Sequence, residues 1–334
     1  MYKIGHLILS SILIFILLTP NDVRANQSFD SWLTEFKIKA KNSGISDDTI
    51  KLALSDVKYL EKVIGYDRKQ PEFFEKTSVY ISKRASKRAM KEAKRKYKNN
   101  FNLFNKIEKE FKIEKEILLA LWGIETNFGK HVGKMDIISS LATLSFDKRR
   151  SEFFTNELIT VLDLVDKDII DHKILFGSWA GAFGFFQFMP STIDRYAIDF
   201  NNNNLIELKK NEDAFASAAN YLNRIGWKKK EPCFIPVNLK ENIPEKYLNS
   251  SARKIKNKKK LKFFKKYILN ANLNYDDNQI VGIITPDFEI VENPNKLNPA
   301  YIVFDNYEKI LKWNRSLRFA LAVCTLKNKF INEI

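Results

Sequence analysis

The sequence predicts a mainly α-helical protein with a small α+β insertion. Residues 29–128, 151–168 and 191–225 carry apolar side chains at helical spacing, as in Trp32, Phe36 and Ala40. After Trp227 the pattern changes to short β-rich runs, CFIPVNL, QIVGIIT and AYIVFD, separated by the lysine-rich stretch RKIKNKKKLKFFKKY. The run LRFALAVCTL then predicts a closing helix. With 45% hydrophobic and 13% aromatic residues, the 334-residue chain can bury a sizeable core.

The N-terminus has the three parts of a secretory signal peptide. Lys3 and His6 precede an apolar block at 7–18, and Val23 and Ala25 satisfy the small-residue rule for cleavage. An uncleaved anchor is the alternative, but the block covers 12 positions where a spanning helix needs roughly 20. We therefore expect residues 1–25 to be removed, leaving an exported chain that starts at Asn26. No cysteine lies near this site, so no stable membrane anchor is expected.

The chain is strongly basic. Its net charge is +16, and +15 without residues 1–25, which suits a polyanionic partner such as an acidic cell wall, anionic lipid or nucleic acid. The alternative is a Lys-, Asn-, Ile- and Phe-rich composition without a specific partner. Between Ser82 and Asn100 the run SKRASKRAMKEAKRKYKNN places cations all round a predicted helix, with Tyr97 as its single aromatic residue. This indicates a solvated surface and argues against nucleic-acid binding.

The cysteines and histidines exclude several kinds of chemistry. Cys233 and Cys324 could form one bridge in an exported chain, but two separate buried thiols are the favoured interpretation. Beyond residue 25 the histidines are His131 and His172, with no CxxC or HExxH pattern. The sequence therefore argues against a zinc enzyme and against nucleophilic catalysis by a Cys/His pair.

The stretch LLALWGIETNFGKHVGK, residues 118–134, places one acid on an apolar helix. Leu118, Leu121, Trp122 and Glu125 share one helical face, and Gly129 is the expected helix-ending residue. Desolvation and the negative end of the helix dipole both predict a carboxyl pKa raised toward neutrality. Such a group can act as a general acid, for example toward a glycosidic oxygen. The alternative is a surface glutamate at a frayed helix end.

A second stretch, GSWAGAFGFFQFMPST at 177–192, offers polar groups beside glycines. Gly177, Gly181 and Gly184 leave room for close backbone approach, while Ser178 and Gln187 provide hydrogen bonds. It is not a phosphate loop, because no Gly-Lys-Ser/Thr follows. Its aromatic side chains could stack on sugar rings or belong to the core: Trp179, Phe183, Phe185, Phe186 and Phe188.

These motifs together resemble the lytic murein transglycosylases of the MltB type, glycoside hydrolase family 103. The resemblance runs through SWLTEFKIKAKNSGIS, DRKQPEF, ALWGIETNFG, LATLSFDKRRSEFF, GSWAGAFGFFQFMPST, RYAIDF, ANYLNRIGW and ILKWNRS. It implies a lysozyme-like helical catalytic domain, of the goose-type or soluble lytic transglycosylase kind, over 26–230. Residues 231–300 match poorly and are expected to form the α+β insertion, and 301–334 to return to the catalytic domain.

The resemblance also implies an activity and its residues. The enzymes cleave the β-1,4 bond between N-acetylmuramic acid and N-acetylglucosamine and form 1,6-anhydromuramic ends, which makes Glu125 the acid and then the base. Arg149 and Arg150 would meet carboxylates of the stem peptide, and Phe319 stands where a tyrosine is expected. The implied cleft residues are Ser178, Gln187, Phe188, Tyr221, Trp313 and Asn314.

Peptidoglycan glycan strands and stem peptides are the implied partners, in the periplasm, and other cell-wall enzymes are further candidates. Two alternatives to this activity remain at the level of sequence. One is a non-catalytic peptidoglycan-binding or scaffolding protein, and the other is a hydrolytic muramidase.

A structural calcium ion is a further expectation from the resemblance, since some members hold one in an EF-hand-like loop. The matching segment is DFNNNNLIELKKNED, where Asn204 replaces the expected turn glycine and only two ligands are charged. An ion-free asparagine-rich turn is the alternative, and no cofactor is expected to be required. The expected ligands are Asp199, Asn201, Asn203, the Leu205 carbonyl and Asp213.

Overall fold

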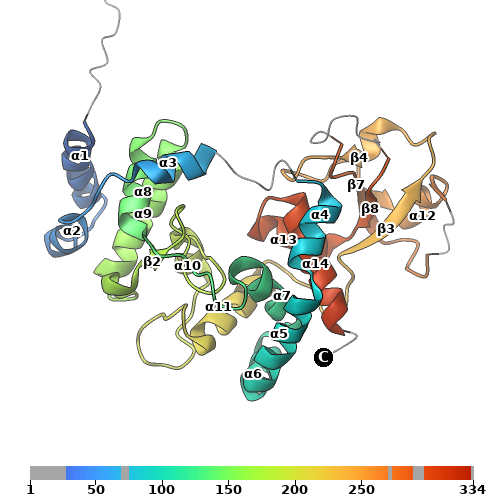
Figure 1. The fold of residues 1–334 in the computed structure, drawn as a ribbon, viewed down its shortest axis with the longest axis horizontal. Coiled ribbons are helices and arrows are strands. Elements are labelled where there is room, and N and C mark those ends of the chain that lie inside the picture. Colours follow the sequence, from blue (N-terminus) through green and yellow to red (C-terminus); the bar gives the residue numbers. More distant parts are fainter. Residues whose placement is uncertain (1–27, 69–74, 270–272, 289–296, 332–334) are drawn as a thin grey trace, which may run out of the picture.

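The computed structural model describes residues 28–68, 75–269, 273–288 and 297–331. The expected signal peptide and its cleavage site at Ala25 lie outside these residues. Within them the chain is mostly helical with small sheets, which confirms the predicted fold class (Figure 1). No described helix has the length and apolar character needed to cross a membrane.

The N-terminal helices α1, α2 and α3 lie together with α8, α9 and α10 at one end of the molecule (Figure 1). Three of the helices have N-cap side chains that accept backbone N–H groups of the first turn. Ser28 caps α1, Ser46 caps α2 and Asp136 caps α8. Helices α8 and α9 pack along each other, and α2 and α10 contact α9. The bounds are α1 Phe29–Asn42, α2 Asp47–Leu54, α3 Glu61–Arg68, α8 Ile137–Phe146, α9 Ser151–Asp166 and α10 Pro190–Tyr196.

The basic run between Ser82 and Asn100 differs from its prediction. It contains two helices, because Ser86 accepts the N–H of Ala89 and starts a new helix there. Met90 and Ala93 are buried, and most cations of α5 lie away from this apolar side, whereas half-buried Lys96 places its Nζ 4.7 Å from the centroid of the Trp122 ring. The helices of this central part are α4 Thr77–Arg84, α5 Lys87–Asn99, α6 Phe101–Phe111 and α7 Lys115–Thr126.

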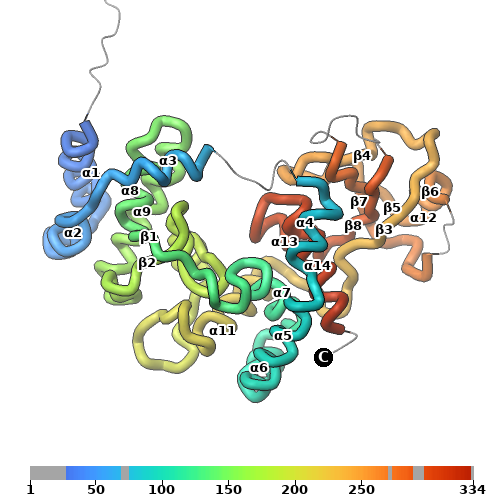
Figure 2. Tube along the Cα trace, viewed as in Figure 1, coloured from blue at the N-terminus to red at the C-terminus, as the bar shows by residue number. Residues whose placement is uncertain are grey.

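The C-terminal helices return to the middle of the molecule. In Figure 2 the red α14 runs beside the cyan α4 and α5, and α14 packs along α7. Apolar side chains from α7, α9, α11 and α14 therefore share one buried cluster. The remaining helices are α11 Asn211–Arg224, α12 Leu261–Lys265, α13 Asp305–Trp313 and α14 Leu317–Ile331, with 3₁₀ turns at His172–Ile174 and Glu245–Tyr247.

The predicted β-rich runs form the larger sheet, in the order β4-β7-β8-β3-β6, with β5 also paired to β7. The pairs are antiparallel except β4 with β7, and β8 straddles the expected boundary at residue 300. A second, separate cluster of buried side chains lies on this sheet. The strands are β1 Met135–Asp136, β2 Phe176–Gly177, β3 Phe234–Leu239, β4 Leu248–Asn249, β5 Lys259–Lys260, β6 Ile268–Leu269, β7 Ile280–Ile284 and β8 Ala300–Val303. Strands β1 and β2 form a small antiparallel sheet of their own.

The prediction of two separate thiols was wrong. Cys233 and Cys324 form a disulfide with a Cα–Cα distance of 6.0 Å, and both residues are fully buried. Cys233 immediately precedes β3, while Cys324 lies in the middle of α14. The bridge joins the first long strand of the sheet to the helix that packs along α7.

Candidate active site

Glu125 lies in the last turn of α7, as predicted, but the helix differs from the expected one-sided stripe. Ile117, Leu119 and Ala120 are as fully buried as the predicted face, so α7 is enclosed all round. The helix ends at Asn127 rather than Gly129, because Asn127 takes the left-handed conformation at φ +49°. Glu125 is half-buried at the point where this enclosed helix reaches the surface.

Trp313 holds the carboxylate of Glu125. Its indole Nε1 donates a hydrogen bond to Glu125 Oε1 at 3.0 Å, although 188 residues separate the two. Trp313 is the last residue of α13, and Asn314 ends that helix by donating its N–H to the Ile310 carbonyl. The sequence placed Trp313 in the cleft as a sugar-binding residue, and the structure shows that its polar edge contacts the candidate acid itself.

A ladder of aromatic rings supports Trp313. Its ring stacks on Tyr221 of α11 with centroids 4.8 Å apart, and Tyr221 stacks on Tyr196 of α10 at 4.3 Å. Phe188 presents its edge to both Tyr221 and Trp313. The Tyr221 hydroxyl donates to the Lys312 carbonyl, and burial, followed by the Tyr196 phenol, raises its pKa to about 12.

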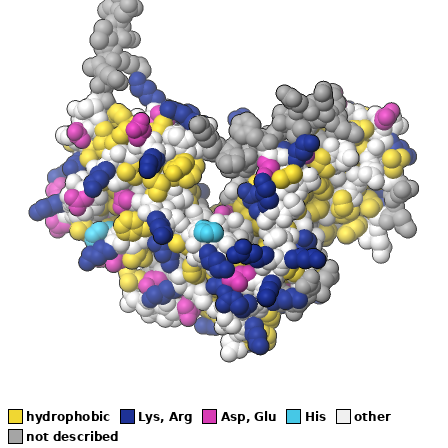
Figure 3. Space-filling model, in the orientation of Figure 1, with side chains coloured by type: hydrophobic (Ala, Val, Ile, Leu, Met, Phe, Trp, Pro, Cys, Tyr) yellow, Lys and Arg dark blue, Asp and Glu magenta, His cyan; other side chains and the backbone are white. Residues whose placement is uncertain are grey.

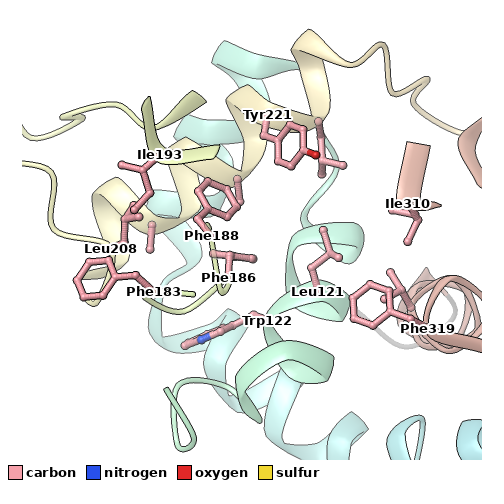
Figure 4. Close-up of a cluster of buried hydrophobic side chains, with 14 of the residues drawn as sticks. Leu121, Trp122, Phe183, Phe186, Phe188, Ile193, Leu208, Tyr221, Ile310 and Phe319 are labelled. Atoms are coloured by element: carbon pink, nitrogen blue, oxygen red, sulfur yellow. The ribbon is translucent and has the colours of Figure 1, made fainter. Parts of the chain in front are cut away.

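These rings and their neighbours are closely packed. Phe186, Phe188 and Tyr221 lie over Leu121 and Trp122 of α7 (Figure 4). Phe188 is 2% exposed and Tyr221 8% exposed, so neither offers a free face to a sugar ring in this structure. Their contact with Trp313 makes them supports of the site.

Ser178 and Gln187 occupy the glycine-rich stretch beside the end of α7. Ser178 Oγ accepts the N–H groups of Ala180 and Ala182, which leaves its own proton to donate to a ligand. Gln187, at φ +50°, donates its amide to the carbonyls of Val132 and Gly184, and its amide oxygen remains an acceptor. Both side chains are therefore fixed with one hydrogen-bonding group to spare.

Two contacts join this stretch to the segment that follows Glu125. Thr126 directly follows the candidate acid, and its Oγ1 donates a hydrogen bond to the Phe185 carbonyl at 2.8 Å. Gly133 has φ +83°, and a Cβ there would lie 2.0 Å from the Gly177 carbonyl oxygen, so a side chain would force the two loops apart. The predicted close backbone approach at Gly177 is thus confirmed.

Arg149 and Arg150 meet a carboxylate of the protein itself. Arg149 Nε donates to Asp67 Oδ2 at 2.6 Å, and Arg150 Nη2 donates to Asp67 Oδ1. Asp67, at the end of α3, is 3% exposed, while the two arginine side chains remain 46% and 38% exposed. The pair holds α3 to the start of α9, and part of each guanidinium still faces solvent.

Phe319 has a structural place. It is 4% exposed and belongs to the same buried cluster as Leu121 and Ile310 (Figure 4). Its backbone N–H donates a hydrogen bond to Ser316 Oγ at 3.2 Å, which fixes the first turn of α14. An apolar ring suits this environment.

The predicted calcium loop closes on its own hydrogen bonds. Asp213 is fully buried, and its two oxygens accept the N–H groups of Phe200 and Glu207, each at 2.9 Å. Asp199 accepts the N–H groups of Asn203 and Asn204, and Asn204 takes φ +67° where a glycine was expected. No group of three or more His, Cys, Asp or Glu side chains within the described ranges could hold a metal ion. The residues thus do not fit the expected cage, because Asp213 serves as a loop-closing acceptor.

The sequence missed three parts of this site. Asp67 lies in the quoted DRKQPEF motif, but nothing marked it as the partner of two arginines. Tyr196, the outer ring of the ladder, also lies in a quoted motif, RYAIDF, and its role depends on helix packing. The bond between Trp313 and Glu125 left no signal in either local pattern.

Comparisons with known proteins identify the family of this chain. The profile of the Transglycosylase SLT domain family matches residues 28–328. Membrane-bound lytic murein transglycosylase B of Escherichia coli (strain K12) is 39% identical over 135 residues, which is 40% of this chain and 37% of that protein. The matched region therefore spans little more than a third of the relative's length.

Two solved structures share most of the fold. SltB3 from Pseudomonas aeruginosa, in complex with NAG-NAM-pentapeptide, superposes with a TM-score of 0.81 at 28% identity, covering 91% of this chain and 80% of SltB3. The Escherichia coli lytic transglycosylase Slt35 in complex with calcium gives a TM-score of 0.75 at 25% identity, covering 92% and 94%. With its lysozyme-like neighbours and a family profile that matches almost its whole length, this chain belongs to the Transglycosylase SLT domain family.

Proposed function

We propose that the chain is a lytic murein transglycosylase that cleaves the β-1,4 bond between N-acetylmuramic acid and N-acetylglucosamine in peptidoglycan. The observation that carries this proposal is the placement of Glu125, half-buried at the end of an enclosed helix and held by the Trp313 indole at 3.0 Å. A carboxyl group fixed in one orientation can deliver a proton to one defined oxygen. Family membership and the relatives named above support the same activity.

The reaction then needs one carboxyl group acting twice. Glu125 donates its proton to the glycosidic oxygen, the bond from that oxygen to C1 of muramic acid breaks, and N-acetylglucosamine leaves. The substrate's N-acetyl group stabilises the cationic C1. Ionised Glu125 then takes the proton from the muramic 6-hydroxyl, whose oxygen attacks C1 and closes the 1,6-anhydro ring. The proton returns to Glu125 and no water is consumed.

The surrounding groups have complementary tasks. The Ser178 hydroxyl, the Gln187 amide oxygen and the Asn314 side chain are proposed to bind hydroxyl and N-acetyl groups of the sugar. Phe188 and Tyr221 act on the substrate indirectly, because both are buried beneath Trp313. One face of the Trp313 ring is covered by Tyr221, and the other face is proposed to contact a sugar, while Nε1 donates to Glu125.

Recognition of the stem peptide is proposed for the exposed parts of Arg149 and Arg150. Asp67 satisfies some of their N–H groups and orients both guanidiniums, and the remaining donors suit a carboxylate. SltB3 has been determined with NAG-NAM-pentapeptide and with NAG-anhNAM-pentapeptide, which supports a peptide-bearing glycan as the partner here.

The organisation and location of the protein complete the proposal. Residues 26–230 and 301–334 would form the catalytic unit and 231–300 the insertion, since one buried cluster unites α7, α11 and α14 and another lies on the sheet. Export to the periplasm with cleavage after Ala25 rests on the N-terminal sequence. Mass determination of the mature protein tests it, with a first residue of Asn26 expected.

The product of the reaction decides between the candidate functions. Purified protein incubated with peptidoglycan is expected to release muropeptides that end in 1,6-anhydro-N-acetylmuramic acid, lighter by one water than hydrolysed products. Liquid chromatography with mass detection measures this directly. Reducing muramic ends would instead identify a muramidase. Tight binding to peptidoglycan with no new ends would identify a scaffolding protein.

A further inference from the structure

One carboxylate of the insertion reaches the helices that carry the candidate site. Asp287 lies three residues after the end of β7, and its side chain is 13% exposed. Its Oδ1 accepts a hydrogen bond from Arg318 Nη2 at 2.8 Å, and Arg318 is buried in the first turn of α14. The Pro286 carbonyl accepts from the same Nη2 at 3.0 Å. Two neighbouring groups of the insertion thus bind one buried guanidinium.

The same carboxylate caps the start of α4. Thr77, the first residue of α4, donates its N–H to Asp287 Oδ1 and Oδ2 at 3.1 and 3.2 Å and its hydroxyl to Oδ1 at 2.6 Å. Lys76, which precedes the helix, supplies no side-chain cap, and a carboxylate is a favoured partner for a helix N-terminus. We call Asp287, Thr77 and Arg318 the Asp287 clamp. It joins the end of β7 to the starts of α4 and α14.

The start of α14 determines where Trp313 lies. Only three residues separate Trp313, the end of α13, from Leu317, the start of α14. Within this turn the Ser316 N–H donates to the Asn314 carbonyl at 2.8 Å, and the Tyr307 hydroxyl of α13 donates to the Leu317 carbonyl at 2.7 Å. A connection this short and this strongly bonded transmits a shift of the first turn of α14 to Trp313.

The burial of Arg318 is unusual for a cation. Lys and Arg side chains are spread over the face of the molecule in Figure 3, where water solvates them. Arg318 is 4% exposed, and its Nε has no hydrogen-bond acceptor in the part of the chain that the structure describes. A buried ion pair often adds little to stability compared with apolar side chains of the same volume. It does define the distance and direction between its partners, and here these are the sheet and α14.

We propose that Asp287 is a positioning residue for the candidate acid, and this inference rests on the function proposed above. Through Arg318 the carboxylate fixes the start of α14, and through the short turn it fixes Trp313, whose indole holds Glu125. The ladder of aromatic rings supports the Trp313 side chain, while the Asp287 clamp holds the backbone next to it. The insertion therefore completes the active site, although it has a buried cluster of its own.

The test compares two buried ion pairs on the same helix. Asp287→Asn breaks the pair with Arg318, and Glu114→Gln breaks the pair of Glu114 with Lys327. Lys327 lies nine residues after Arg318, about 13 Å further along α14, and its side chain is equally buried. Each variant leaves a buried cation without its partner, so both should melt below the wild type. Turnover is measured at a temperature at which circular dichroism shows both variants to be folded.

We expect Asp287→Asn to lower kcat about tenfold and to change KM less than about twofold, because a misplaced acid slows the reaction more than it weakens binding. Glu114→Gln should keep kcat within about twofold of the wild type, since its pair lies far from the turn. In a Trp313→Phe background, Asp287→Asn should lower kcat by less than about twofold, because the indole through which it acts is absent. Equal losses of kcat in the two ion-pair variants, or a full further loss in the Trp313→Phe background, would overturn the proposal.

A measurement without substrate separates this inference from the proposed function. Protein made with isotopically labelled tryptophan gives five indole N–H signals in nuclear magnetic resonance, and the Trp313 signal is the one missing from Trp313→Phe. In Asp287→Asn this signal should move toward the position of a solvated indole, and in Glu114→Gln it should stay. An unmoved signal refutes the clamp whatever the enzyme makes. A moved signal in a wild-type protein that forms no anhydro ends refutes the function and supports the clamp.

A paired variant covers the case in which Asp287→Asn does not fold. Asp287→Asn combined with Arg318→Met leaves no buried charge, and the new amide oxygen can still accept the Thr77 N–H. Its melt should lie near that of the wild type, while kcat still falls about tenfold and the Trp313 signal still moves. Wild-type kcat with an unmoved signal in this variant would show that the clamp does not position Glu125.

Discussion

The indole nitrogen of Trp313 donates a hydrogen bond to Oε1 of Glu125 at 3.0 Å, and Trp313 is itself held by the stacked rings of Tyr221 and Tyr196. The candidate acid is thus oriented by three other helices, α10, α11 and α13. This arrangement assigns Trp313 a positioning role that can be tested apart from sugar binding.

Trp313→Phe removes the donor and keeps an aromatic ring. We expect kcat to fall roughly ten- to hundredfold, the cost of a hydrogen bond to a charged group, with a smaller change in KM. The basic limb of the pH–rate profile should move to higher pH, because the lost N–H stabilised ionised Glu125. Tyr221→Phe keeps the ring ladder and serves as control. An unshifted profile would refute the positioning role.

Glu125→Gln replaces the acid by a neutral side chain of the same shape. Release of anhydromuropeptides should disappear, while the melting temperature stays unchanged or rises slightly, since catalytic carboxylates are often held at a cost to stability. Turnover and thermal unfolding of one preparation give both numbers. Activity within tenfold of the wild type would remove Glu125 from the mechanism, and a large drop in melting temperature would mark it as a structural residue.

The disulfide should contribute strongly to stability. It closes a loop of 91 residues, and in the chain-entropy account such a bridge stabilises the fold by about 4–5 kcal/mol. Cys324→Ser, or reduction of the wild type, should therefore lower the urea concentration at the midpoint of unfolding. Circular dichroism measures the fraction unfolded at each urea concentration. Cys233→Ser should behave in the same way. Indistinguishable midpoints with and without reductant would contradict this expectation.

Tyr221 should make unfolding sensitive to alkaline pH. Its pKa in the fold is about 12, above the value of about 10 in an unfolded chain. The folded protein then holds a proton that the unfolded chain loses, so stability falls as pH rises from about 10 toward 12. Urea unfolding at a series of pH values should show a steeper decline for the wild type than for Tyr221→Phe. Parallel declines would mean that the phenol is not shifted.

Calcium is expected to have little effect. Both oxygens of buried Asp213 already accept backbone N–H groups, which leaves Asp199 as the one remaining charged ligand of the two expected. Addition of millimolar calcium chloride to protein treated with chelator should raise the melting temperature by less than about 1 °C, in line with weak binding. A rise of several degrees that Asp199→Ala removes would show that the loop does bind the ion.

The parts of the site that depend on local pattern could be predicted, and those that depend on distant packing could not. The apolar run before Glu125 places this acid in the last turn of a helix, and the glycines at 177 and 184 indicate close backbone approach. Asn127 as the helix end was a near miss, because asparagine also adopts the left-handed conformation that was assigned to Gly129.

Pairings between remote residues were beyond the sequence. Cys233 and Cys324 lie 91 positions apart, and nothing in their neighbourhoods shows that β3 begins beside the middle of α14. The contact of Asp67 with the two arginines depends on how α3 packs against α8, which precedes them in the chain. The amphipathic character of α5 was missed for a local reason, since the break at Ser86 resets the helical phase that the longer run suggested.

The order in which the polypeptide is made gives the packing of α14 against α7 a further consequence. Glu125 is synthesised early, but its partner Trp313 follows 188 residues later, and α14, which encloses α7, comes later still. A nascent or truncated chain that ends before residue 313 therefore holds the candidate acid without the groups that orient it. Under the proposed function, a chain that stops before residue 313 is therefore expected to be inactive, because it lacks the contact that orients Glu125.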